Sequence, residues 1–221
     1  MSFDFNPFYS SHPNYYGLKP SQGLSEFLES CSLKTGKALD LGCGQGRDSI
    51  YLAQVGFTVL SLDSSSVGIE SLVRVATEMH LDIECRAQDI ALYEFPRETF
   101  DIVIASTILD HLKYEDLINV TQGIIRTLKL GGFAYILIFT TDDIGYVQKQ
   151  EGIEDSENQP SETSAAIQHY FAPNELCELF KEAKVVQYLE TKFLSTSHGD
   201  PHWHSIGRGI FEKKKRSSLP L

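Results

Sequence analysis

Residues 40–47 read Asp-Leu-Gly-Cys-Gly-Gln-Gly-Arg, and this glycine-rich stretch decides how the rest of the chain is interpreted. It follows a short β-rich run, Lys37–Leu41, and precedes a segment of helical period, Arg47–Val55. Glycines allow a tight turn and a close approach of the backbone to a ligand, and the N-terminus of a helix favours an anionic group. The stretch therefore predicts a strand–loop–helix unit that binds a small molecule.

Beyond this loop, short apolar runs alternate with longer segments of helical period as far as residue 139. Apolar residues in the longer segments recur at i, i+3 and i+4, which is typical of amphipathic helices, and Leu24–Cys31 shows the same spacing. The alternation predicts a doubly wound α/β sheet with right-handed crossovers. The further strands expected here are Phe57–Leu62, Leu81–Arg86, Phe100–Ala105 and Phe133–Phe139.

The composition argues against several classes of protein. Nineteen Lys and Arg stand against thirty Asp and Glu, a net charge of −11, and such a surface repels phosphate backbones. No apolar stretch approaches the roughly 20 residues that cross a bilayer, and the N-terminus does not resemble a signal peptide. The four cysteines form no CxxC pair, which favours reduced thiols. We expect a cytoplasmic protein that binds neither nucleic acid nor a membrane.

The spacing of the loop glycines separates two classes of cofactor. A dinucleotide fingerprint requires Gly-x-Gly-x-x-Gly. Counted from Gly42, the third glycine position holds Arg47, and counted from Gly44 it holds Ser49. The loop instead reads Gly-x-Gly-x-Gly, with Asp40 two positions upstream of its first glycine. This spacing disfavours a nicotinamide-dependent oxidoreductase.

Two carboxylates follow later strands of the predicted sheet. Asp63 ends the second strand, where a carboxylate can accept hydrogen bonds from both hydroxyls of a ribose. Asp89 follows the third strand and can accept from an adenine amino group while Ile90 packs on the ring. Either aspartate alone could be a loop or N-cap residue. Together with the glycine loop, at successive strand ends, they predict a nucleoside-binding site.

With these motifs, residues 37–139 resemble class I S-adenosylmethionine-dependent methyltransferases. The motifs are DLGCGQGR at 40–47, LD ending at residue 63, QDI at 88–90 and LKLGG at 128–132. Residues 39–63, LDLGCGQGRDSIYLAQVGFTVLSLD, are similar to the tellurite-resistance (TehB-like) methyltransferases. The resemblance implies a Rossmann-like, seven-stranded sheet with an antiparallel last strand.

The resemblance also implies S-adenosylmethionine as the cofactor and S-adenosylhomocysteine as the product. It places the loop glycines nearest the methionine moiety, an aspartate at the ribose, an aspartate–isoleucine pair at the adenine and a serine near the methyl group. The cofactor-binding residues expected on this basis are Asp40, Gly42, Gly44, Gly46, Asp63, Ser64, Asp89, Ile90 and Ser106.

After residue 139 the pattern changes. Residues 140–168 lack periodicity and carry five acidic residues between Glu151 and Glu162, and we expect them to form a mobile lid over the substrate pocket. A helix, Pro173–Ala183, and two extended segments forming an antiparallel pair are expected to follow. We expect one domain, 1–221, with an N-terminal arm and helix (1–33), a cofactor-binding core (37–139), an acidic loop or lid (140–168) and a substrate-side helix and terminal strand pair (169–221).

Several residues are candidates for the substrate side of the site. His111 follows the fourth strand, where the reacting atom lies in this fold, and is a candidate catalytic base or orienting group, the alternative being a capping or surface histidine. Tyr16 precedes the core and could close over the cofactor, or it could anchor the N-terminal arm. His169 and Tyr170 end the acidic segment, where a plain loop-to-helix junction is the alternative.

Histidines also cluster before the last strand. His202 and His204 face the same way on a strand, and His198 could join them to bind a metal or an oxyanion. They lack the fixed spacing and acidic partner of a catalytic zinc motif, so no metal site is expected.

These features predict a methyltransferase that acts on a small molecule, with a chalcogen oxyanion or a thiol as candidate acceptors. A soft nucleophile with a lone pair, such as a thiolate or a selenium or tellurium oxyanion, needs no general base, whereas an oxygen or nitrogen nucleophile usually does. The alternatives are a non-catalytic, regulatory S-adenosylmethionine-binding protein and the oxidoreductase already disfavoured. A methyltransferase acting on macromolecules is disfavoured by the acidity and the size of the chain.

Overall fold

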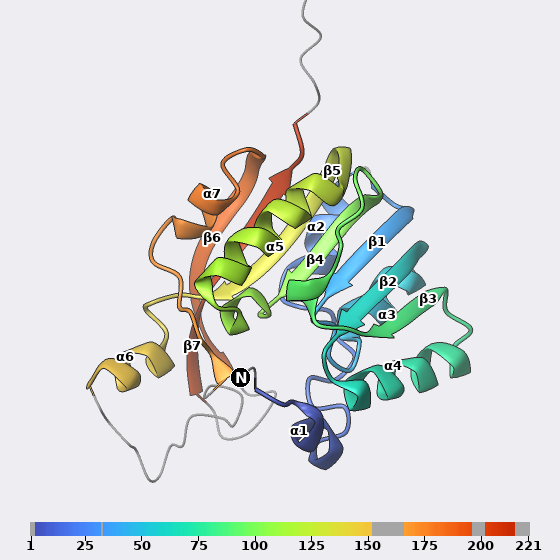
Figure 1. Ribbon diagram of the computed structural model, residues 1–221, viewed down its shortest axis with the longest axis horizontal. Coiled ribbons are helices and arrows are strands. Elements are labelled where there is room, and N and C mark those ends of the chain that lie inside the picture. Colours follow the sequence, from blue (N-terminus) through green and yellow to red (C-terminus); the bar gives the residue numbers. More distant parts are fainter. Residues whose placement is uncertain (1–2, 32, 152–165, 196–201, 215–221) are drawn as a thin grey trace, which may run out of the picture.

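Within residues 3–31, 33–151, 166–195 and 202–214, which the computed structural model describes, seven strands form one sheet (Figure 1). The strands are β1 (Gly36–Leu41), β2 (Phe57–Asp63), β3 (Ile83–Ala87), β4 (Phe100–Ser106), β5 (Leu128–Phe139), β6 (Lys184–Ser195) and β7 (His202–Glu212). The helices are α1 (Asn6–Ser11), α2 (Leu24–Ser30), α3 (Arg47–Gln54), α4 (Ser66–Glu78), α5 (Tyr114–Thr127), α6 (Ile144–Glu151) and α7 (Glu175–Leu179), with short 3-10 helices η1 (Ile90–Leu92) and η2 (Leu109–His111).

The strand order is β3-β2-β1-β4-β5-β7-β6, and β1 to β5 pair in parallel. The last strand, β7, lies between β5 and β6 and pairs antiparallel with both. The prediction of a doubly wound sheet with an antiparallel last strand is therefore confirmed. The order reverses between β1 and β4, and the crevice at such a reversal, beside the carboxyl ends of the strands, is where open α/β sheets bind ligands.

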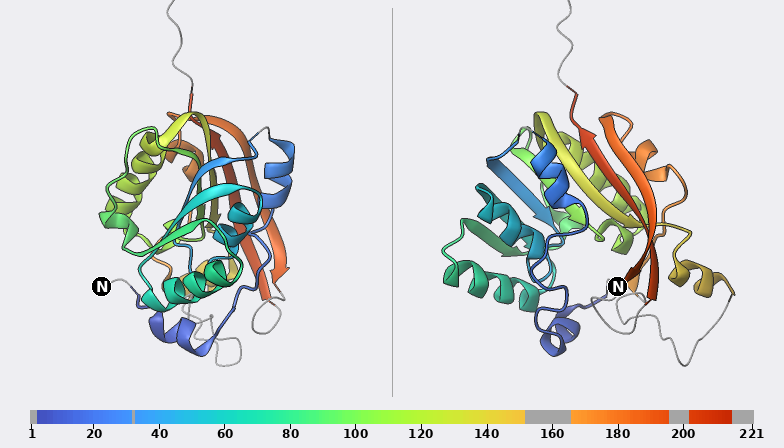
Figure 2. Two further views of the ribbon diagram at one scale, coloured as in Figure 1. Left: turned by 90° about the vertical axis from the view of Figure 1, so that its right-hand side faces the viewer. Right: turned by 180° about the vertical axis from the view of Figure 1, so that it is seen from behind.

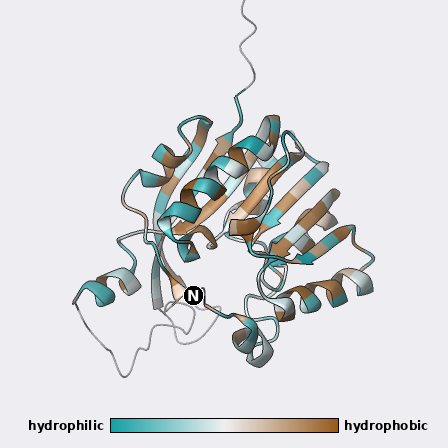
Figure 3. Cartoon of the chain, in the orientation of Figure 1, coloured by the Kyte–Doolittle hydropathy of each residue, from teal (hydrophilic) through white to brown (hydrophobic). Residues whose placement is uncertain are grey.

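The side chains of the central strand β4 alternate between two hydrophobic layers. Val103 and Ala105 face a layer that contains α5 and α7, whereas Ile102 and Ile104 face a layer that contains α2 and α3. Figure 2 shows helices on both sides of the sheet, and Figure 3 shows hydrophobic residues along the central strands. A strand covered on both faces consists of a nearly continuous run of apolar residues, which explains why the sequence of β4 predicts a strand in the interior of the sheet.

Three boundaries differ from the expectations. Residues 144–151 form α6, although we expected them in an irregular segment. β5 begins at Leu128 instead of Phe133, because Leu128 already pairs with Phe100 of β4, before a register shift that brings Phe133 opposite Ile102. α7 is shorter than the predicted helix 173–183, beginning after Asn174, which has a left-handed backbone conformation. The acidic stretch 152–165, the main part of the expected lid, lies outside the described residues.

The first testable prediction concerns the attachment of the terminal strand pair. Phe211 of β7 stacks on Phe180 with ring centroids 4.4 Å apart, and both rings are fully buried. We expect Phe211→Ala to lower the free energy of unfolding by about 3–5 kcal/mol, because it removes a buried ring and leaves a cavity. Denaturation with urea measures the change. The control Leu189→Ala, at an exposed position of β6, should change it by less than about 0.5 kcal/mol. Equal losses would show that β7 is not anchored through this stack.

Candidate active site

The glycine loop after β1 is held by hydrogen bonds to the end of β2. The backbone N–H groups of Gly42 and Cys43 donate to the carbonyl of Leu62 at 2.8 and 3.0 Å. Gly46, the N-cap of α3, has φ +92°, and a Cβ there would lie 2.2 Å from the side chain of Leu72. Only glycine fits this conformation and space, and no side chain caps α3. The first N–H groups of the helix therefore remain available to an anionic ligand group.

Asp63 lies at the junction of this loop with β2. Its Oδ2 accepts a hydrogen bond from the Gly44 N–H at 2.7 Å, and its Oδ1 accepts from the Ser65 N–H at 2.8 Å. Burial raises the pKa of Asp63, and the two donated N–H groups oppose that shift. The carboxylate thus fixes the loop in place and lines the cavity beside it.

A second buried carboxylate, Asp40, lies beneath the loop. Its Oδ2 accepts a hydrogen bond from the Ser49 hydroxyl at 2.5 Å, and Ser49 accepts from Ser61 at 2.7 Å. Burial, followed by the nearby Asp48, raises the pKa of Asp40 to about 8. A cationic ligand group bound beside Asp40 would favour its ionised form, so this end of the cavity suits such a group.

The N-terminal arm lies against the same cavity. The side-chain carbonyl of Asn6 accepts from the Ser65 hydroxyl at 2.8 Å and from the Val67 N–H at 3.2 Å, which joins α1 to the start of α4. Phe5 packs edge-on against His111, with ring centroids 5.3 Å apart. Burial, and then Asp63, raises the pKa of Tyr9, whose ring also lines the cavity. Sequence reasoning missed these contacts.

One cavity of about 280 Å³ collects most of the predicted site residues. Its lining includes all nine expected cofactor-binding residues: Asp40, Gly42, Gly44, Gly46, Asp63, Ser64, Asp89, Ile90 and Ser106. Tyr16, His111 and His204 also line it. Asp89 caps η1 through the Ala91 N–H at 2.9 Å, so it serves as an N-cap at the cavity wall. The sequence pattern and the geometry therefore agree on the place of the site.

The structure does not bring every candidate to this cavity. His169 pairs with Glu175 at 2.8 Å, and Tyr170 packs on Tyr146, and neither lines the cavity. His198 and the side chain of His202 lie outside the described residues. Within the described parts of the chain, no group of three or more His, Cys, Asp or Glu residues could hold a metal ion.

His111 lies in η2 after β4 and lines the cavity. Its Nδ1 lies 3.1 Å from the carbonyl of Ala166, and burial lowers the pKa of the ring. Because a carbonyl only accepts hydrogen bonds, Nδ1 carries the proton. The neighbouring Asp110 is fully buried, and one of its oxygens accepts from the Phe139 N–H at 2.7 Å.

Comparison with known proteins identifies the family of this chain. The family described as "Tellurite resistance protein TehB" matches residues 8–193. The chain belongs to this family. The match agrees with the resemblance to TehB-like methyltransferases that the glycine loop predicted.

The curated relatives extend beyond the part that matches. A probable S-adenosyl-L-methionine-dependent methyltransferase TehB from Haemophilus influenzae is 27% identical over 155 residues, covering 70% of this chain and 48% of the relative. The cypemycin N-terminal methyltransferase from Streptomyces is 34% identical over 122 residues, covering 54% of this chain and 49% of the relative. The chain therefore spans about half the length of the curated relatives it matches.

A solved structure supports the fold. The crystal structure of TehB from Haemophilus influenzae superposes with a TM-score of 0.71 at 21% identity, covering 95% of this chain and 67% of that one. In the described part of this TehB-family chain, no helix is long and apolar enough to cross a membrane.

A second prediction concerns Asp63. We expect Asp63→Ala to weaken the binding of S-adenosylhomocysteine by about 1–3 kcal/mol, because charged hydrogen bonds are lost. Titration calorimetry measures the affinity. The control Asp82→Ala removes a carboxylate that accepts from the Thr58 hydroxyl at 2.7 Å beside the start of β3 and does not line the cavity, so it should leave the affinity unchanged. Unchanged affinity in a folded Asp63→Ala protein would remove Asp63 from the site.

A third prediction follows from the pKa of Asp40. A carboxyl group whose pKa is higher in the folded than in the unfolded state stabilises the fold at low pH, and this contribution is lost as the pH rises towards about 8. Asp40→Asn cannot ionise. As the pH rises from 5 to 8, the unfolding free energy of the variant should therefore increase relative to that of the unchanged protein, by up to about 1.4 kcal/mol per pH unit. Urea unfolding at several pH values measures it, and a constant difference would contradict the assignment.

Proposed function

We propose that this TehB-family chain transfers a methyl group from S-adenosylmethionine to a small-molecule acceptor, a thiol or a chalcogen oxyanion. The observation that carries the proposal is the convergence of the glycine loop, Asp63 and Asp89 on one cavity that continues past Ser106 to β7. The name of the Haemophilus relative supports the same cofactor.

The cavity walls fit the parts of this cofactor. The uncapped start of α3 suits a carboxylate, and the buried Asp40 and Asp48 suit a cationic group. Asp63 suits the ribose, and Asp89 with Ile90 suits the adenine. When bound, the cofactor supplies an activated methyl group. The chain has to align the acceptor with that group and to exclude water. Such alignment lowers the activation barrier by several kcal/mol through proximity alone.

The acceptor side of the cavity favours a small molecule. Phe139, Phe193 and Ile206 line it, together with His111, and make it partly apolar. A net charge of −11 disfavours a polyanionic macromolecule. A soft sulfur, selenium or tellurium nucleophile suits such walls and agrees with the family description. Tyr16, whose ring lies 5.2 Å from the guanidinium carbon of Arg47, could contact either ligand.

The fourth prediction tests turnover. Titration calorimetry should show saturable binding of S-adenosylmethionine and S-adenosylhomocysteine and none of NADH. With a panel of thiols and with tellurite, S-adenosylhomocysteine and a methylated acceptor should form in equal amounts, measured by mass spectrometry. At limiting cofactor, Asp63→Ala should slow the reaction and Asp82→Ala should not. Tight binding without any product would identify a regulatory binding protein instead, and binding of NADH alone would favour an oxidoreductase.

A further inference from the structure

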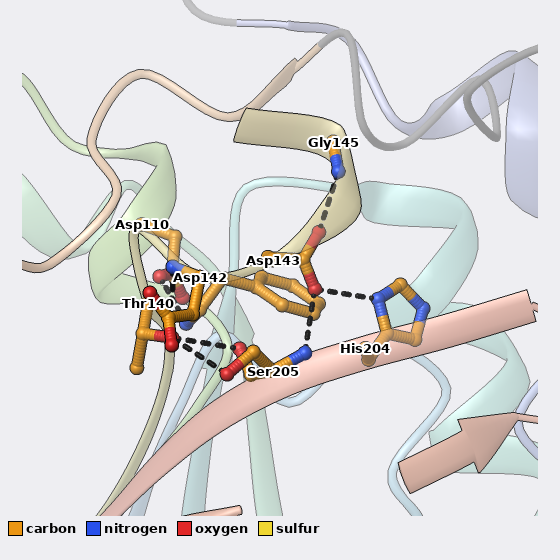
Figure 4. A network of polar contacts seen from close by, with 8 residues as sticks. Asp110, Thr140, Asp142, Asp143, Gly145, His204 and Ser205 are labelled. Atoms are coloured by element: carbon orange, nitrogen blue, oxygen red, sulfur yellow. Dashed lines mark hydrogen bonds and ion pairs between the residues drawn. The ribbon is translucent and has the colours of Figure 1, made fainter. Parts of the chain in front are cut away.

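A histidine–aspartate pair joins β7 to the segment after β5 (Figure 4), and its histidine, His204, lines the cavity. His204 Nδ1 lies 3.0 Å from Asp143 Oδ2. The same oxygen accepts from the Ser205 N–H at 2.9 Å, and Oδ1 accepts from the Gly145 N–H at 2.9 Å. The side chain of Asp143 is 4% exposed and that of His204 is 12% exposed. The carboxylate is thus held rigidly by two backbone donors, while the imidazole reaches the cavity surface.

We propose that His204 is the general base of the methyl transfer and that Asp143 positions it, so that the acceptor carries a dissociable proton. This inference rests on the proposed function. It selects the thiol over the oxyanion, because the selenium or tellurium atom that attacks the methyl group bears no proton, whereas the attacking sulfur of a thiol does. Three observations support this role of His204: the way Asp143 holds its ring, the position of the pair along the sheet, and the difference between His204 and His111.

The carboxylate determines which nitrogen of His204 carries the proton. Asp143 already accepts hydrogen bonds from backbone N–H groups at both oxygens, so it acts as an acceptor towards Nδ1 as well. A neutral imidazole with its proton on Nδ1 has its lone pair on Nε2. This is the arrangement by which an aspartate orients a catalytic histidine and stabilises its protonated form.

The imidazole is also fixed in space. The ring of Phe139 lies 5.1 Å and that of Phe193 5.8 Å from the His204 ring, both tilted against it. Thr140 joins β5 to β7 through its N–H, which donates to the Ser205 carbonyl at 3.0 Å, and its hydroxyl, which donates to the Ser205 hydroxyl at 2.8 Å. A base held in this way loses little conformational freedom when an acceptor binds.

The pair lies on the acceptor side of the predicted methyl position. Ser106, the residue expected near the methyl group, ends β4, and β7 lies two strands away, which corresponds to about 10 Å between backbones. Side chains that extend into one cavity from these strands can contact opposite sides of a small acceptor. Asp63 and Asp89 lie on the other side of β1, so the nucleoside and the base do not compete for space.

His111 differs from His204 in one respect that matters for a base. Among the described residues, its recorded polar partner is the neutral Ala166 carbonyl, and burial lowers the pKa of its ring. A proton gained there would have no opposing charge. Near the His204–Asp143 pair, Asp110 and Tyr170 are titratable neighbours of Asp143. Burial is the main cause that raises the pKa of each, and the charge of Asp143 is a smaller cause. The Asp143 carboxylate is therefore the group that compensates a proton on His204.

The proposed step balances as follows. The acceptor thiol loses its proton to Nε2 of His204 as its sulfur forms a bond to the methyl carbon. The bond between that carbon and the sulfonium sulfur breaks, and its electron pair stays on the departing sulfur. The products are the methyl thioether, S-adenosylhomocysteine and one proton, which passes from the imidazolium to solvent.

The fifth prediction compares two acceptors, 2-mercaptoethanol, which is mostly protonated at pH 7, and 4-nitrothiophenol, which is already ionised. His204→Gln and Asp143→Asn should slow methylation of the first on the order of 100-fold and of the second far less, because only the first needs a base. Asp142→Asn is a matched control, since this neighbouring carboxylate is exposed and, within the described residues, forms an ion pair with Lys192 at 3.4 Å. Its rates should equal those of the unchanged protein.

A second measurement needs no turnover. Nitrogen NMR of histidine-labelled protein without cofactor should show the neutral His204 ring protonated at Nδ1, and Asp143→Asn should alter this tautomer while Asp142→Asn does not. A proton on Nε2 in the unchanged protein would overturn the proposal, and this result does not depend on whether the variants fold.

The kinetic outcomes separate the two proposals. Equal losses on both thiols, or an acceptor-dependent loss in His111→Gln instead of His204→Gln, would overturn the role of His204. Methylation of tellurite but of neither thiol by the unchanged protein would overturn it too and leave the proposed function standing. Absence of product from every acceptor would contradict the proposed function itself.

Discussion

The hydrogen bonds that join the glycine loop to the end of β2 are the constraint on which the site depends. Asp63 accepts from the Gly44 N–H, and the Leu62 carbonyl accepts from Gly42 and Cys43. These bonds satisfy buried backbone donors in a loop that forms no regular structure. They also set the direction in which α3 leaves the sheet. A change at either strand end would therefore move the helix start, the loop and the carboxylate together.

The first half of the molecule could be predicted because its signals are local. Each parallel strand is a short apolar run, each loop glycine lies beside the strand it follows, and Asp63 ends the run that contains it. Parallel strands bring their carboxyl ends to one edge of the sheet, so residues far apart in sequence are placed together by topology alone. The position of Asp89 and Ser106 in the lining of one cavity follows from this rule.

The second half could not be predicted in the same way because its contacts are set by register. Asp143 and His204 are separated by 61 residues, and nothing in the sequence near either one indicates the other. The pairing of Phe139 with Ile206 brings them together, and that register depends on packing between strands. The N-terminal arm was missed for a related reason. Asn6 binds the start of α4 through side-chain hydrogen bonds that leave no periodic pattern in the sequence.

The antiparallel course of β7 explains how a late segment of the chain contributes to this edge of the sheet. A parallel strand presents its last residues at the carboxyl edge, whereas an antiparallel strand presents its first. His204 lies near the beginning of β7 and therefore reaches the same edge as Ser106 at the end of β4. Insertion of β7 between β5 and β6 also places this beginning directly beside the segment that holds Asp143. Moved to the outer edge of the sheet, beyond β6, the same strand would carry its histidine one strand farther from the cofactor loop. The order of the last two strands thus places His204 beside Asp143 at the edge of the sheet where the glycine loop lies.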